Sequence, residues 1–135
     1  MPLLVDAGVL YALVDRSDAW HSRAVDYVKA SNTNLLAPVT VLPEAAYLIR
    51  TRLGLREELK LIEGFVNSEV GVEPLSDGDL SRALAVMAKY PELGFTDSTI
   101  VAMAERLALT TIATTDRRHF KAVRPRHVRQ FTLVP

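Results

Sequence analysis

Short β-like segments alternate with longer amphipathic windows along this chain of 135 residues. Strands are predicted at residues 3–5, 35–37, 70–75, 111–115 and 130–134, where apolar and β-branched side chains run together or alternate. The windows between them carry apolar residues at spacings of three and four, which indicates helices. Strands that alternate with helices are typical of an α/β fold with a parallel sheet.

Capping residues mark where the predicted helices begin. Ser17 or Asp18 can cap one helix, Ser76 or Asp77 can cap another, and Thr40 and Thr96 can cap two more. We expect the helix after Ser76 to face inward through an apolar stripe made of Leu80, Leu84 and Met87. A short basic helix is expected after residue 116, and the other helices are predicted over residues 8–14, 18–30, 41–53, 55–67, 77–89 and 97–107.

The composition predicts a folded protein in a single domain over residues 1–135. Hydrophobic residues make up 49% of the chain and charged residues 24%, which argues against disorder. The absence of cysteine excludes a disulfide framework, a thiolate metal site and a cysteine nucleophile, and it fits a reducing compartment. Asp6 interrupts the apolar N-terminal stretch, and no long apolar run follows, so we expect a cytoplasmic protein with no membrane segment.

Positive charge is concentrated near the end of the sequence although the formal net charge is zero. The balanced total does not indicate a strongly basic nucleic-acid-binding domain. The stretch 117–129 contains no acid, and it either contacts phosphates or forms a solvated surface, which is the interpretation favoured by this segment alone. Its six basic residues are Arg117, Arg118, Lys121, Arg124, Arg126 and Arg129.

Four acids occur where predicted strands end or helices begin. Asp6 follows the first strand and Asp116 the fourth, while Asp97 and Glu44 lie in the first turns of two helices. Open parallel sheets place their ligand sites outside the carboxyl ends of the strands, so the fold would bring these acids to one edge. Apolar neighbours predict partial burial, and crowded carboxylates resist ionisation unless a cation compensates them.

Each acid also has a purely structural interpretation. Asp6, Asp97 and Asp116 could cap helices, and Glu44 could complement a helix dipole. Taken together, however, they predict a site for Mg²⁺ or Mn²⁺, which prefer carboxylate and water oxygens. Two such ions about 4 Å apart can hold the attacking water and the leaving oxygen of a phosphodiester. The chemistry needs no histidine or serine nucleophile.

Four segments resemble, in order, the motifs of the PIN-domain family: Val5–Leu13, Pro43–Leu48, Phe95–Ala104 and Ile112–Phe120. The resemblance covers nearly the whole chain. It implies a three-layer α/β/α sandwich with a mainly parallel sheet of about five strands.

The same resemblance implies Mg²⁺- or Mn²⁺-dependent cleavage of RNA. It assigns Asp6, Glu44, Asp97 and Asp116 as metal ligands or their immediate supports, and it matches Thr114 to a supporting hydroxyl. Arg117 and Arg118 directly follow Asp116, which makes them the candidates for contact with RNA phosphates. Many proteins of this size in the family are VapC-type toxins, which form homodimers and are silenced by a small antitoxin that covers the acidic site.

Two positions depart from the family pattern. Gly8 stands where a serine or threonine hydroxyl is common. Gly94 and Ser98 flank Asp97, where an additional acid is sometimes found. Metal ligation could therefore rest on fewer groups, and a single ion is an alternative to two.

Two other functions compete with the nuclease. A receiver-type signalling module would need adjacent acids after the first strand and an aspartate at the end of the third, whereas Asp6 stands alone and residues 72–75 contain no aspartate. A PIN-like scaffold that binds RNA or protein without cutting is disfavoured by the intact acids. Trp20 and Tyr11 could stack on RNA bases, but packing is the favoured interpretation. His119 could lie near Asp116 and contact phosphate, but a surface histidine is the favoured interpretation.

Overall fold

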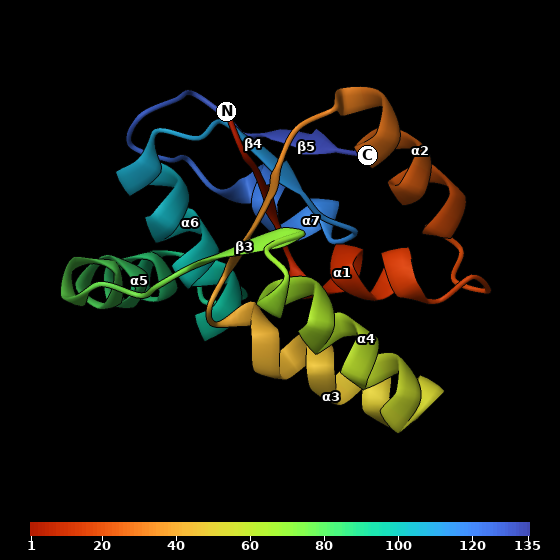
Figure 1. The fold of residues 1–135 in the computed structure, drawn as a ribbon. Helices are drawn as coiled ribbons and strands as arrows, with labels where there is room; N and C mark the ends of the chain where they lie inside the picture. The colour runs from red at the N-terminus through yellow and green to blue at the C-terminus, as the bar shows by residue number, and fades with distance from the viewer.

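A five-stranded parallel sheet forms the centre of the computed structural model, which describes residues 1–135 (Figure 1). The strand order is β3-β2-β1-β4-β5. The sheet is therefore built outward from β1, first to one side through β2 and β3, and then to the other side through β4 and β5. The parallel α/β fold with five strands is therefore confirmed. The strands are β1 (Leu3–Val5), β2 (Leu35–Pro38), β3 (Val70–Glu73), β4 (Thr111–Ala113) and β5 (Thr132–Val134).

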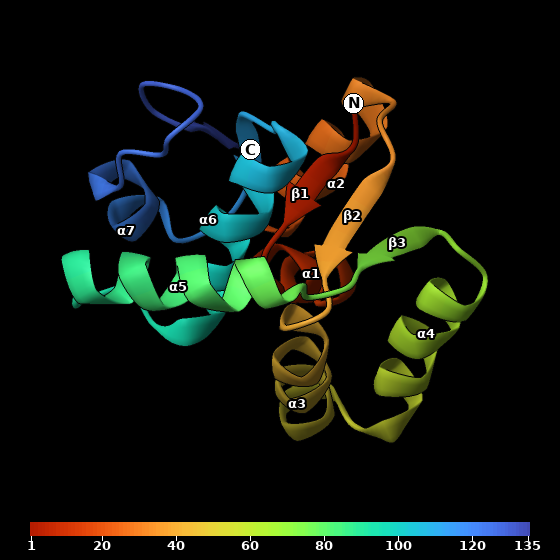
Figure 2. The same cartoon turned by 90° about the vertical axis from the view of Figure 1, so that its left-hand side faces the viewer.

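Seven helices flank the sheet. Helices α3 and α4 pack against each other and extend beyond the end of the strands, while α5 packs on α6 (Figures 1 and 2). None of the helices combines the length and the apolar character that a membrane span requires. The helices are α1 (Ala7–Val14), α2 (His21–Ser31), α3 (Val41–Leu53), α4 (Leu55–Val66), α5 (Asp77–Lys89), α6 (Phe95–Leu107) and α7 (Arg117–Ala122).

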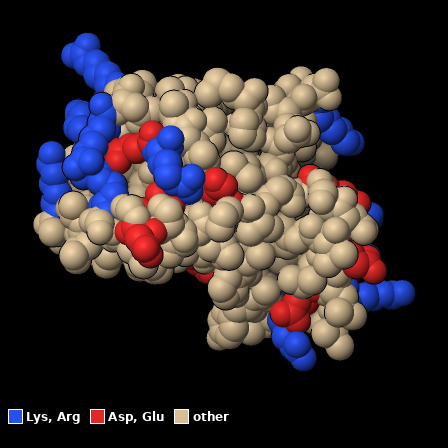
Figure 3. Space-filling model, turned by 60° about the vertical axis from the view of Figure 1, so that its left-hand side comes forward, with Lys and Arg blue, Asp and Glu red and all other residues tan.

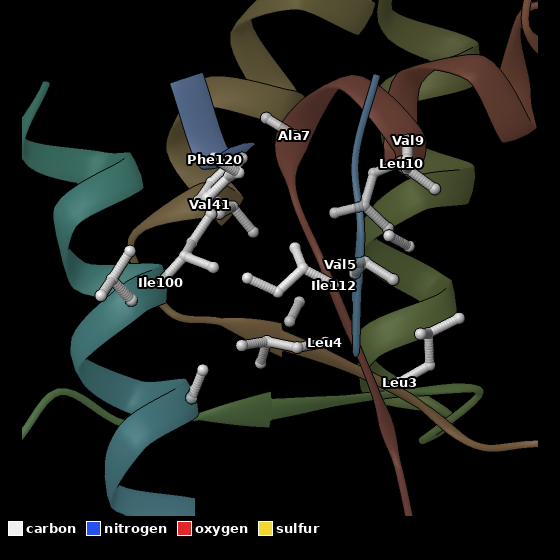
Figure 4. Close-up of a cluster of buried hydrophobic side chains, with 14 of the residues drawn as sticks. Leu3, Leu4, Val5, Ala7, Val9, Leu10, Val41, Ile100, Ile112 and Phe120 are labelled. Carbon is white, nitrogen blue, oxygen red and sulfur yellow. The ribbon is translucent and has the colours of Figure 1, made fainter. Parts of the chain in front are cut away.

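The core lies on both faces of the central strands. Leu4 of β1 pairs with Ile112 of β4, and both side chains are fully buried. Figure 4 shows these side chains between Ile100 of α6 on one side and Leu10 of α1 on the other. A central strand buried on both faces is nearly all apolar, and its register is fixed by this packing. The position of Asp6, the first residue after β1, is fixed with it.

Two helix starts differ from the prediction. Helix α2 begins at His21, because Asp18 uses its carboxylate to accept a hydrogen bond from the backbone N–H of Trp20 in a local turn. Helix α6 begins at Phe95, two residues before the predicted start, with Gly94 and not Thr96 at its N-cap. The strands β3, β4 and β5 are each two residues shorter than expected.

The predicted inner face of α5 is wrong. Leu80 is 46% exposed and Leu84 is 71% exposed, whereas Ala83 and Val86 are buried. The buried stripe begins with Asp79, whose carboxylate accepts hydrogen bonds from the guanidinium of Arg106 in α6. The ion pair thus lies on the same buried face of α5 as Ala83 and Val86, and hydrophobic periodicity alone does not reveal this face because it begins with an acid.

Candidate metal centre

Asp6 lies immediately after β1 and is only 6% exposed. Its Oδ1 accepts a hydrogen bond of 2.8 Å from the backbone N–H of Val9, which caps α1, and its Oδ2 accepts one of 2.5 Å from the hydroxyl of Thr114. Burial raises the pKa of Asp6 to about 6, although these two hydrogen bonds oppose the rise. The negative charges of Asp116 and Glu44 raise it further. The capping interpretation of Asp6 is therefore confirmed, and it does not prevent the same carboxylate from facing the other acids.

Asp97 lies in the first turn of α6, half-buried, and its carboxylate has no hydrogen-bond partner. Burial raises its pKa to about 6, and repulsion from Asp6, Asp116 and Glu44 acts in the same direction. Only the neighbouring His119 opposes the rise. This carboxylate does not cap a helix, so the structural interpretation fails for it.

Thr114 links two of the acids. Its hydroxyl donates to Asp6 and accepts a hydrogen bond of 2.8 Å from the backbone N–H of Asp116. Asp116 is the N-cap of α7, and its Oδ2 lies 2.8 Å from Nδ1 of His119. One buried hydroxyl thus fixes the relative positions of two segments that are 108 residues apart in the sequence.

The donor atoms closest to one another belong to Asp97, Asp116 and His119. One ligand atom from each lies within 4.8 Å of the other two. Two carboxylates and an imidazole form a donor set suited to a divalent ion such as Mn²⁺, and the unpaired, crowded state of Asp97 calls for a cation. His119 is 35% exposed and lies against Asp116, which agrees with the alternative position near Asp116 rather than with the favoured surface histidine. The spacing of three residues between Asp116 and His119 was the sequence signal for this contact.

Glu44 lies further out than the three aspartates. It is exposed in the first turn of α3 and, together with Asp97, lines an open pocket of about 590 Å³. It is still near enough for its charge to raise the pKa of both Asp6 and Asp97. The four acids singled out in the sequence therefore converge at the carboxyl ends of β1 and β4. Of the two expected phosphate contacts, Arg117 is half-buried and Arg118 is exposed beside them.

Gly8 is explained by a close approach of two segments. A Cβ atom added at this position would collide with Oγ1 of Thr115 and would lie 3.4 Å from Oδ1 of Asp6. The hydroxyl of Thr115 thus occupies the space of a side chain at position 8. Gly94 has no such neighbour, because a Cβ there would meet nothing within 4 Å.

Two sequence comparisons show what the chain as a whole is similar to. The sequence model of the PIN domain matches residues 3–124. Ribonuclease VapC26 of Mycobacterium tuberculosis is 28% identical, over 98% of this chain and the whole of the relative.

Solved structures share the fold. VapC20 of Mycobacterium tuberculosis, described as a sarcin–ricin loop cleaving toxin, superposes with a TM-score of 0.80 at 20% identity, covering 87% of this chain and 92% of its own. A toxin–antitoxin complex from Klebsiella pneumoniae superposes with a TM-score of 0.70 at 18% identity, covering 90% of this chain and 92% of the matched chain. DNA-bound VapBC from Salmonella typhimurium superposes with a TM-score of 0.70 at 14% identity, covering 98% of this chain and 96% of the matched chain. The match extends across nearly the whole molecule.

Proposed function

Because the chain belongs to the PIN-domain family, we propose that it is a metal-dependent endoribonuclease that hydrolyses RNA phosphodiester bonds as the toxin of a toxin–antitoxin pair in the cytoplasm. The observation that carries the proposal is the convergence of acids from four distant segments, two of which have a pKa raised to about 6. Such a cluster is costly for folding, and it becomes favourable when a divalent cation binds. The relative VapC26 is named a ribonuclease and spans the same length.

Each side chain has a role in this proposal. Asp97, Asp116 and His119, whose ligand atoms lie within 4.8 Å of one another, would hold the ion together with Asp6, and Glu44 would act at the rim of the site. Mg²⁺ or Mn²⁺ would supply a Lewis acid that acidifies water and stabilises the charge developing on the scissile phosphate. Supporting groups act around them: Thr114 positions Asp6 and Asp116, and Arg117 and Arg118 contact the RNA backbone.

Protein partners form part of the proposal. Solved relatives include toxin–antitoxin complexes, so we assign this chain a small antitoxin that covers the acidic site, and a second copy of itself as a homodimer partner. Exposed apolar side chains support such contacts, because monomeric surfaces rarely expose a continuous apolar stripe. On α4 the stripe consists of Leu55, Leu59, Ile62 and Val66.

Cleavage assays test the enzyme assignment. The purified protein is incubated with total RNA and with a hairpin containing the sarcin–ricin loop, in Mg²⁺, in Mn²⁺ or in EDTA. Cleavage is expected only with a divalent ion, and Asp97→Asn should abolish it. Glu92→Gln, which changes an exposed carboxylate in the loop before α6, is the matched control and should cleave normally. Undiminished cleavage in EDTA would refute the metal mechanism, and folded, metal-supplied protein that cuts no RNA would favour the non-cutting scaffold.

A further inference from the structure

Two arginine side chains lie against the indole ring of Trp20. It is half-buried in the connection between α1 and α2, and its backbone N–H donates a 2.8 Å hydrogen bond to Asp18. The guanidinium carbon of Arg23 lies 3.8 Å from the ring centroid, and that of Arg117 lies 5.6 Å from it. Two cationic groups from α2 and α7 thus meet at one aromatic side chain.

Neither of these arginines is neutralised. Arg50, Arg82 and Arg106 each form an ion pair with a carboxylate, whereas Arg23 and Arg117 form none. The Nε atom of Arg117 is buried and has no hydrogen-bond partner. A guanidinium over an aromatic face keeps its N–H groups free at its edge, in the fork geometry that suits phosphate oxygens. No carboxylate of the chain pairs with Arg23 or Arg117, so their remaining N–H groups are available to an anion of the substrate.

Arg117 connects the ring of Trp20 to the acidic centre along the chain. Arg117 directly follows Asp116, and the contact between Thr115 and Gly8 holds the end of β4 against the start of α1. A strand of RNA whose scissile phosphate lies at the acids would place a neighbouring phosphate near this ring.

We propose that Trp20, Arg23 and Arg117 form a binding site for a backbone phosphate of the RNA strand, adjacent to the acidic centre. The proposal rests on the proposed function. It favours phosphate binding over base stacking, because the guanidinium of Arg23 at 3.8 Å already covers the ring face that a base would need. Trp20 acts as a platform that orients both cations and stabilises them by cation–π contact.

Trp20 is the single tryptophan of the chain, so its fluorescence reports on this site alone. The full-length protein is titrated in EDTA with a single-stranded hexauridylate RNA at several NaCl concentrations, conditions under which metal-dependent cleavage does not occur. We expect RNA to change the emission of Trp20 and its affinity to fall with salt. Arg23→Gln and Arg117→Gln should each weaken binding roughly 5- to 20-fold and reduce the slope of log affinity against log salt by about 0.7.

The matched control is Arg52→Gln, which removes an arginine lying 5.0 Å from the ring centroid of Tyr11. It should leave RNA affinity and salt slope unchanged. Equal behaviour of all three variants, or a Trp20 response to inorganic phosphate but not to RNA, would overturn the proposal. Because no metal is present, these results stand apart from the cleavage assay. An inactive protein that still binds RNA through Arg23 and Arg117 would contradict the enzyme assignment only.

Discussion

Carboxylates between α5 and α6 are matched by arginines, whereas those at the carboxyl ends of β1 and β4 are not. Asp79 is 2% exposed, and although burial favours its neutral form, hydrogen bonds from Arg106 and Ser76 hold its pKa below the usual range. Glu105 is held in the same way by Arg82, at 2.6 Å. Figure 3 shows acidic and basic side chains intermingled on the side of the molecule that comes forward from the left of Figure 1.

The difference separates what stabilises the fold from what the site requires. The paired acids join α5 to α6 and have their charges satisfied within the chain. Asp6 and Asp97, by contrast, have a pKa raised to about 6, because burial and the charges of neighbouring acids favour their neutral forms and no arginine or lysine is paired with either of them. The proposed function therefore assigns their compensation to a cation from outside the polypeptide.

Removing an unpaired acid should have the largest effect, and it should act on activity. Asp97→Asn is expected to lower the rate of RNA cleavage by roughly 100- to 1,000-fold, because the carboxylate is lost where charge must be supplied to the ion. No hydrogen bond is lost, so the circular dichroism spectrum should stay native. Full activity of the variant would remove Asp97 from the site.

Breaking a paired acid should act on stability. Arg106→Ala leaves the buried Asp79 without its cation and should lower the free energy of unfolding by about 3 kcal/mol, measured by urea denaturation. Arg56→Ala, which removes an exposed and unpaired arginine on α4, is the control and should change it by less than about 0.5 kcal/mol. Equal effects of the two substitutions would show that the α5–α6 ion pairs do not support the fold.

The stability of the metal-free protein should depend on pH through both the unpaired acids of the site and the paired Asp79. The pKa of Asp6 and Asp97 is raised in the folded state, so their contribution is fully present below about pH 4 and is lost as the pH rises through 6. We expect the free energy of unfolding in EDTA to fall by about 1 to 3 kcal/mol from pH 4.5 to 7.5.

Asp79 contributes in the opposite direction. Its lowered pKa gives stability that is present above about pH 4 and is lost as the pH falls further, so stability should be maximal between the two windows. In Asp97→Asn the fall above pH 4.5 should be smaller, and the variant should melt at a higher temperature than wild type at pH 7.5. A flat profile in wild-type protein would argue against repulsion at the site.

The packing between Gly8 and Thr115 should give the smallest effect. Gly8→Ala forces a Cβ against Oγ1 of Thr115, whereas in a Thr115→Ala background the same Cβ meets only the ordinary contacts with Oδ1 of Asp6 at 3.4 Å and the Cβ of residue 115 at 3.6 Å. The double-mutant cycle should show a coupling free energy of about 1 kcal/mol in thermal or urea unfolding. Additive effects would mean that Thr115 does not occupy the space at position 8.

The parallel sheet and the convergence of Asp6, Glu44, Asp97 and Asp116 could be predicted because both follow from the alternation of strands with helices and from the placement of the acids at strand ends and helix starts. The rotation of α5 could not, since it depends on Asp79 meeting Arg106, and nothing in local periodicity pairs residues 27 positions apart. His119 was undervalued because a single histidine carries little information until its neighbours are known. The pairing of Thr115 with Gly8 likewise exists only in three dimensions.

The central claim is that a divalent cation relieves repulsion among these acids. Isothermal titration calorimetry of metal-free protein with Mn²⁺ at pH 6, in two buffers of different protonation enthalpy, tests it directly. Binding should release protons, because Asp6 and Asp97 are partly protonated at that pH, and Asp97→Asn should bind more weakly and release fewer. Absence of Mn²⁺ binding, or binding without proton release in wild-type protein, would contradict the account.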